Sequence, residues 1–130
     1  MILHKSHASL APGGLLIVEI QTRNAVEQLG RTEASEYSCE SGLFSDQPHH
    51  CRTENKWLDK QRVTVQVFTV TETDAGKTHI YRSTTKAWSD EDLRELLTDA
   101  GFSDASRLDA WPSNSDDLAL WTARASEISP

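Results

Sequence analysis

The chain has 130 residues, enough for one domain, with 13 basic and 20 acidic side chains and a formal net charge of -7. This acidic balance argues against a nucleic-acid backbone or an anionic membrane as the main partner, and no apolar run reaches membrane-spanning length. Residues 1–5 lack the apolar segment of a secretory signal, so we expect a cytoplasmic protein.

The turn at Pro12, Gly13 and Gly14 leads directly into an apolar run over residues 15–18. Residues 2–10 fit the last turns of a helix that ends before this turn, because proline and glycine break helices. A continuous apolar run of strand length is typical of a parallel strand buried on both faces. Its parallel neighbours would need long crossover connections, so we expect a larger sheet whose other strands are not all in this chain.

Capping residues and polar composition predict a short helix and then a loop after the apolar run. Thr22 or Asn24 is suited to cap a short helix over residues 25–29, with Gly30 as its end. Residues 31–48 are polar and fit a loop. Three side chains in that loop can anchor it: Tyr37, Leu43 and Phe44.

The middle of the chain is rich in β-branched and aromatic residues. Residues 63–71 and 78–87 predict a β-hairpin around a turn at residues 73–77, in which Gly76 can adopt a left-handed conformation. Residues 51–58 fit a third strand. The meander would be antiparallel, and its mixed faces suggest that one side meets water or a ligand.

The sequence of the last third of the chain predicts a helix and a second hairpin. Ser89 can cap a helix with a capping-box acid at Asp92, and Gly101 can end it. The apolar side chains of this helix form one stripe at i, i+3, i+4 and i+7: Leu93, Leu96, Leu97 and Ala100. We expect Phe102 to pack back on Leu97. Residues 105–111 and 118–125 fit a hairpin around a turn at 112–117, and the residues beyond it should fray.

Two local motifs carry a family resemblance. Leu10, Ala11 and the Pro-Gly-Gly turn precede a strand, and the segment Leu96-Leu97-Thr98-Asp99-Ala100-Gly101-Phe102 ends a helix. In this order, with a closing antiparallel hairpin, they resemble the C-terminal half of a class I S-adenosylmethionine-dependent methyltransferase. Ala11 stands where that family usually has a basic residue.

The resemblance implies an α/β fold. It consists of a partial Rossmann-like methyltransferase sheet with one parallel strand, a C-terminal antiparallel hairpin and helix, and an inserted antiparallel β-meander. Residues 1–130 would form a single domain, with about 31–88 as a lid on the acceptor side. The implied reaction moves a methyl group from S-adenosylmethionine to a small-molecule acceptor, helped mainly by proximity and orientation.

The family's cofactor-binding signature is missing. Class I enzymes hold S-adenosylmethionine with a glycine-rich turn, and no Gly-x-Gly-x-x-Gly occurs in these 130 residues. The chain would then be a fragment, a truncated reading frame, or one part of a sheet completed by a partner chain or a second copy, and inactive alone. The alternative is a non-catalytic small-molecule-binding or assembly module derived from that fold.

The candidate acceptor residues fall into two groups. Glu19, Gln21 and Thr22 follow the apolar strand, where ligands bind in open α/β sheets. Aromatic side chains of the insertion can line a pocket: Tyr37, Phe44, Trp57 and Tyr81. Methyl transfer often needs no dedicated base, so no catalytic residue is predicted.

Metal binding and acid–base catalysis have weaker sequence support. His49 and Cys51 can share one face of a strand, with Cys39 upstream, but the spacing matches no structural zinc pattern. A Cys39–Cys51 disulfide stays open as an alternative. His79 can lie beside Tyr81 as a general base, although a single histidine on a strand is more often a surface residue.

Overall fold

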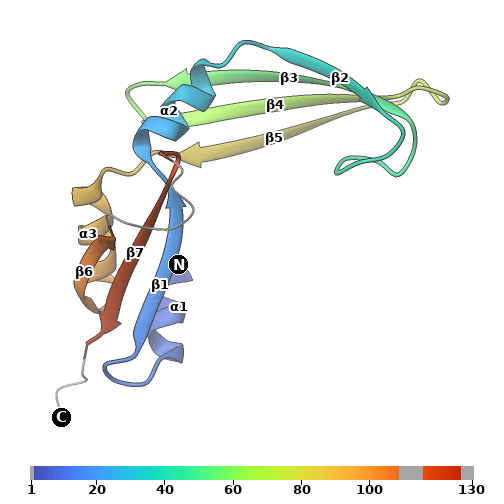
Figure 1. Ribbon diagram of the computed structural model, residues 1–130. Helices are drawn as coiled ribbons and strands as arrows, with labels where there is room; N and C mark the ends of the chain where they lie inside the picture. The colour runs from blue at the N-terminus through green and yellow to red at the C-terminus, as the bar shows by residue number, and fades with distance from the viewer. Residues whose placement is uncertain (1, 109–115, 127–130) are drawn as a thin grey trace. The chain divides into compact units, whose positions relative to one another are not determined.

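A computed structural model describes residues 2–108 and 116–126. The chain divides into two compact units, Met1–Ala25 with Trp88–Pro130, and Val26–Ala87. The first unit contains α1 (Ile2–Ser9), β1 (Leu15–Gln21), α3 (Asp90–Asp99), β6 (Phe102–Leu108) and β7 (Leu118–Ala125). The second contains β2 (Ser35–Cys39), β3 (His49–Leu58), β4 (Val63–Glu72) and β5 (Thr78–Lys86), and the unit boundary falls within α2 (Arg23–Arg31). Figure 1 labels these elements. None of the helices in the described part of the chain has the length and apolarity of a membrane span.

The sheet of the first unit has three strands in the order β1-β7-β6, and both pairs are antiparallel. β1 pairs with β7 along its whole length, from Leu15 opposite Arg124 to Gln21 opposite Leu118. The predicted closing hairpin is confirmed, although residues 109–115 of its connection lie outside the described residues, as do residues 127–130, which were expected to fray. Among the described strands β1 pairs only with β7, and this antiparallel pair agrees with the predicted closing hairpin. The expected parallel neighbours of β1 are not among the described strands, so the parallel strand stays a prediction.

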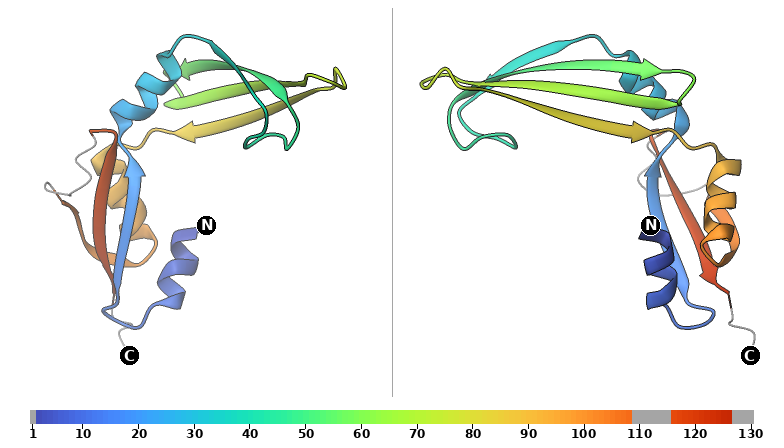
Figure 2. Two further views of the ribbon diagram at one scale, coloured as in Figure 1. Left: turned by 45° about the vertical axis from the view of Figure 1, so that its right-hand side comes forward. Right: turned by 180° about the vertical axis from the view of Figure 1, so that it is seen from behind.

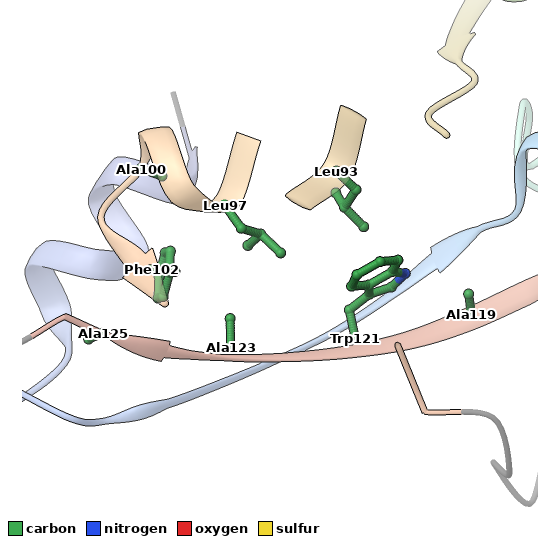
Figure 3. Packing of buried hydrophobic residues seen from close by; sticks show 8 residues of the cluster. All are labelled: Leu93, Leu97, Ala100, Phe102, Ala119, Trp121, Ala123 and Ala125. Atoms are coloured by element: carbon green, nitrogen blue, oxygen red, sulfur yellow. The ribbon is translucent and has the colours of Figure 1, made fainter. Parts of the chain in front are cut away.

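One face of this sheet carries the core of the unit (Figure 3). Leu93 and Leu97 of α3 point toward Trp121 and Ala123 of β7, and Phe102 lies in the same cluster, next to Leu97 as predicted. Burying each large side chain contributes about 2 kcal/mol. Residues from α1, β1 and the turn between them pack against this cluster: Leu3, Leu10, Leu16, Val18 and Ile20.

The opposite face of β1 is open. Its side chains alternate in exposure, and Leu15 and Ile17 retain 47% and 58% of their accessible surface. The prediction of a strand buried on both faces is therefore wrong in this structure. The physical reason is that α1 and α3 both pack on the core face (Figure 2). The apolar run at residues 15–18 consequently serves one buried face and one exposed face.

The predicted capping signals of α3 are present in the structure. The backbone N–H of Asp92 donates to the Ser89 hydroxyl at 3.1 Å, and the backbone N–H of Ser89 donates to the Asp92 carboxylate at 3.1 Å. Three acidic residues occupy the first turn, where they stabilise the positive end of the helix dipole. Gly101 has φ +94°, the left-handed conformation expected of it.

The two earlier helices partly match their predictions. α1 ends at Ser9, before the Pro-Gly-Gly turn, as predicted. Thr22 caps α2, because its hydroxyl oxygen accepts a hydrogen bond from the backbone N–H of Ala25 at 3.2 Å. Gly30 does not end α2, which continues to Arg31. The prediction of a helix stop at this glycine is therefore wrong.

The sheet of the second unit is a meander in the order β2-β3-β4-β5, shown with α2 in Figure 1. The predicted hairpin of β4 and β5 and the predicted third strand, β3, are confirmed. Gly76 has φ +62° in the hairpin turn, as predicted. Residues 35–39 correct the loop prediction, because they form β2 and pair with β3. A strand of mainly polar residues forms here since β3 offers it a partner edge, not because of its own propensity.

Candidate functional site

An aromatic cluster covers part of one face of the four-stranded sheet. Phe68 of β4 lies opposite Tyr81 of β5 in the register. Phe44, from the loop between β2 and β3, packs on both rings, with centroid distances of 5.0 Å to Phe68 and 5.3 Å to Tyr81. The Phe44 and Tyr81 rings are stacked, an arrangement that aromatic pairs favour when offset. Tyr81 keeps 42% of its surface exposed, so one face of the cluster meets solvent.

A pair of side-chain amides lies next to this cluster on the same face. Asn55 of β3 is opposite Gln66 of β4, and Gln66 is two residues from Phe68, which places both side chains on the aromatic side. The Gln66 Nε2 donates to the Asn55 Oδ1 at 2.9 Å, and the Asn55 Nδ2 donates to the Thr32 carbonyl at 3.3 Å. This surface therefore combines exposed aromatic area with hydrogen-bonding groups held in fixed orientations. Such a surface can bind a small polar molecule.

Trp57 shares that face but packs under α2. A Cβ added to Gly30 would lie 3.0 Å from the Trp57 Cβ, and the indole Nε1 donates to the Asp59 carboxylate at 3.1 Å. Both contacts give Trp57 a structural role at the end of the sheet nearest α2. Its predicted contact with substrate stays a prediction.

Tyr37 lies on β2, opposite Cys51, with 45% of its surface exposed. Hydrogen bonding with the Cys51 thiol is the largest of the influences that raise the pKa of Tyr37 above its usual value. The hydroxyl therefore stays protonated at neutral pH and can donate a hydrogen bond. Its role toward an acceptor stays a prediction, like that of Tyr81.

Glu19 and Gln21 belong to the first unit. Both point to the exposed face of β1, on the same side as Leu15 and Ile17, because they alternate with the half-buried positions. Thr22, which was considered with them, is engaged in capping α2. The predicted residues thus fall into a polar strand end in one unit and an aromatic face in the other.

The histidines and cysteines of the second unit make contacts that the sequence does not reveal. His49 and Cys51 are both buried, and both cysteines are free thiols. The Cys39 sulfur lies 3.3 Å from His49 Nε2 and 3.9 Å from Nδ1, and the His49 Nδ1 lies 2.8 Å from the Gln47 carbonyl. No group of three or more potential metal ligands occurs among residues 2–108 and 116–126. The Cys39–His49 contact was missed because residues 31–48 were expected to be a loop.

His79 shares the aromatic face with Tyr81, as its spacing predicts. The ring centroids are 6.4 Å apart, and His79 lies opposite Val70 in the register. A general base must come within hydrogen-bond reach of the proton that it removes. The role of His79 as a base therefore stays a prediction.

Four glycines of the described residues are engaged in turns or close packing and not in a cradle for S-adenosylmethionine. A glycine-rich cradle leaves room for backbone amides to approach the ligand. Here the glycines serve other purposes: Gly13 donates its N–H to the Ala125 carbonyl, Gly30 packs on Thr64, Gly76 forms a hairpin turn, and Gly101 packs on His7. No reaction step through the cofactor is therefore assigned to these residues.

Comparison with solved structures identifies the fold. No protein-family model matches the sequence, and no curated protein matches it. Solved structures do match, and two of them, both methyltransferases, show that the chain has the fold of S-adenosylmethionine-dependent methyltransferases over about half of their length. The predicted resemblance is thus confirmed at the level of the fold, and the coverage is consistent with a C-terminal half.

Two of these structures illustrate the extent of the match. An S-adenosylmethionine-dependent methyltransferase from Clostridium acetobutylicum ATCC 824 superimposes with a TM-score of 0.63 at 12% identity. CalS10, an amino pentose methyltransferase from Micromonospora echinaspora involved in calicheamicin biosynthesis and solved with S-adenosylmethionine bound, gives a TM-score of 0.54 at 16% identity. Each match covers 95% of this chain and 49% of the other chain.

Proposed function

We propose that this chain is the acceptor-binding part of an S-adenosylmethionine-dependent methyltransferase that acts on a small molecule. The observation that carries the proposal is the match to the methyltransferase from Clostridium acetobutylicum, which extends over 95% of this chain. Such a match includes residues of both compact units. The fold alone does not fix an activity, so the surfaces described above must supply the chemistry.

The cofactor-binding part comes from residues outside these 130. Two features support this part of the proposal. The sequence contains no Gly-x-Gly-x-x-Gly, and β1 pairs only with β7 among the described strands, which leaves its other edge open to a further strand. Leu15 and Ile17 also offer exposed apolar area beside that edge. A partner segment that adds a strand to β1 would bring the glycine-rich turn with it, and the assembled enzyme would work in the cytoplasm.

The acceptor binds on the aromatic face of the second unit. Tyr81 and Phe44 offer flat apolar surface, and Asn55 and Gln66 offer amide groups next to it. Sugars and other polyhydroxylated molecules present both apolar C–H faces and hydroxyl groups, so they match this combination. The similar protein CalS10 is an amino pentose methyltransferase, which makes amino sugars the first acceptors to test.

Acceptor binding can be measured directly on the chain. Saturation-transfer NMR with a panel of amino sugars, neutral sugars and phenols should detect binding of at least one class. Tyr81→Ala should weaken that binding about tenfold, because loss of an aromatic contact costs about 1 to 2 kcal/mol. Leu43→Ala is the matched control, since Leu43 is 94% exposed and lies one residue from Phe44. Equal binding by both variants would remove the aromatic face from the acceptor site.

Methyl transfer tests the catalytic part of the proposal. Calorimetry should detect no binding of S-adenosylmethionine to the chain alone. Methylated acceptor should form when the chain is combined with a polypeptide that carries the glycine-rich turn, encoded either in frame upstream of Met1 or by a neighbouring gene. If such a complex binds both ligands and forms no product, the chain is a non-catalytic binding module. Micromolar binding of S-adenosylmethionine to the chain alone would contradict the proposal that the cofactor-binding part comes from residues outside this chain.

A further inference from the structure

The outer edge of β5 is an open β-strand edge of nine residues. β5 is the last strand in the order β2-β3-β4-β5, and within the described residues it pairs only with β4. Both of its faces are accessible: Ile80 is 54% exposed on one side and Tyr81 is 42% exposed on the other. A strand in this position presents a row of backbone N–H and C=O groups that can pair with another chain.

β5 lacks most of the features that prevent such pairing. Its sequence, THIYRSTTK, contains no proline and no glycine. Its ladder with β4 runs from Thr71 opposite Thr78 to Val63 opposite Lys86 without a bulge. Only Arg82 and Lys86 place full positive charges on the strand. By contrast, the opposite edge strand, β2, has only five residues.

We propose that a second copy of this chain pairs with β5 in an antiparallel arrangement, joining two four-stranded sheets into one. A closed dimer requires a two-fold axis. For two antiparallel strands in one sheet, this axis is perpendicular to the sheet. It passes midway between one residue of β5 and the same residue of the second copy, so these two residues face each other. This symmetry leaves few registers, centred on single residues of β5.

Charge and side-chain pairing select the register centred on Tyr81. In it, Tyr81 faces Tyr81 of the second copy, Ile80 faces Arg82, and His79 faces Ser83. A register centred on Arg82 would place two guanidinium groups opposite each other, which is destabilising. A register centred on Ser83 would pair two serines at its centre and place Tyr81 opposite Thr85, so the aromatic cross-strand pair would be lost. A register centred on Ile80 would shorten the paired segment.

This pairing extends the aromatic face. Tyr81 stacks on Phe44 within one copy, and the Tyr81 of the second copy would lie directly beside it. The two aromatic clusters would then form one continuous surface around the two-fold axis. This inference does not depend on methyltransferase activity, because it rests on strand geometry and charge alone.

A charge-exchange experiment tests the interface. Sedimentation velocity of the full chain should detect a dimer whose population rises with concentration. Ile80→Arg places an arginine opposite Arg82 twice in each dimer and should raise the dissociation constant about tenfold or more. The double variant Ile80→Arg with Arg82→Glu should restore the dimer. Leu43→Arg, a change at a 94% exposed loop residue, is the control for added charge and should leave the dimer unchanged.

Cysteine cross-linking tests the register. In a Cys39→Ser background, Tyr81→Cys should form a disulfide-linked dimer on oxidation, whereas Ser83→Cys should not. If circular dichroism shows that Ile80→Arg does not fold, the cross-linking result still tests whether β5 pairs with a second copy. Each of three results would overturn the proposal. The chain could stay monomeric at all concentrations, the dimer could be insensitive to Ile80→Arg, or cross-linking could occur preferentially through position 83.

Discussion

Gly30 of α2 lies so close to the hydroxyl of Thr64 that a Cβ added to Gly30 would overlap Oγ1. The same Cβ would lie 3.0 Å from the Trp57 Cα, a backbone atom that cannot move aside easily. Thr64 is itself fully buried, and its hydroxyl donates to the Val26 carbonyl. These contacts fix the helix to the sheet of the second unit.

Gly30→Ala should therefore destabilise the chain by about 1 to 3 kcal/mol, as overpacked interiors do. Urea unfolding followed by circular dichroism measures the effect. Gly42→Ala is the matched control, because the nearest atom to its added Cβ would be the Cys39 sulfur at 3.5 Å, an ordinary contact. Equal stability of both variants would contradict the close packing of α2.

Leu97→Ala should cost about 2 to 5 kcal/mol, because Leu97 is fully buried in the core of the first unit and its loss leaves a cavity. The free energy of unfolding in urea is the measurement. Glu95→Ala, at an exposed position of the same helix, should change it little. An unchanged melting temperature for Leu97→Ala would contradict the packing of α3 in the core.

Ser89→Ala should cost about 1 kcal/mol. The substitution removes the hydroxyl that accepts from the Asp92 N–H and leaves that donor without its cap. Thermal melts of the single variants and of Ser89→Ala with Asp92→Ala should give non-additive losses, since the two residues cap each other. Additive losses would mean that the reciprocal capping contributes nothing.

Glu36 should make a small pH-dependent contribution to stability. Hydrogen bonding from Arg52 lowers the pKa of Glu36 below its usual value of 4.5. A lowered folded-state pKa means that the contribution is present above about pH 4.5 and is lost as the pH falls through the folded value. The difference in urea midpoint between the wild type and Glu36→Gln should therefore shrink between pH 7 and pH 3. A constant difference would show that the Glu36 charge does not matter.

Local signals in the sequence predicted the elements that depend on local chemistry. The capping box at Ser89 and Asp92, the left-handed Gly101 and the hairpin turn at Gly76 all adopt the expected geometry. Each depends on hydrogen bonds or backbone angles within a few residues. Such features can be recognised without knowledge of the tertiary structure.

Features set by distant residues were predicted less well. Gly30 was expected to end a helix, but its lack of a side chain allows contact with Thr64, which is 34 residues away in the chain. β2 was expected to be a loop, because its strand conformation depends on pairing with β3. For the candidate site, the sequence identified Phe44 and Tyr81 but not their stacking, since stacking depends on how the loop folds over the sheet.

The pairing of Leu15 with Arg124 also determines when β1 can fold during synthesis. Roughly 100 residues must be added after β1 before β7 emerges, which takes about 5 to 20 s at typical rates of translation. The whole meander of the second unit is made in that interval and can form from near neighbours. The apolar strand β1, in contrast, stays unpaired until β7 has been made. The ribosome-bound chain therefore exposes a short apolar segment to which a chaperone for such segments can bind.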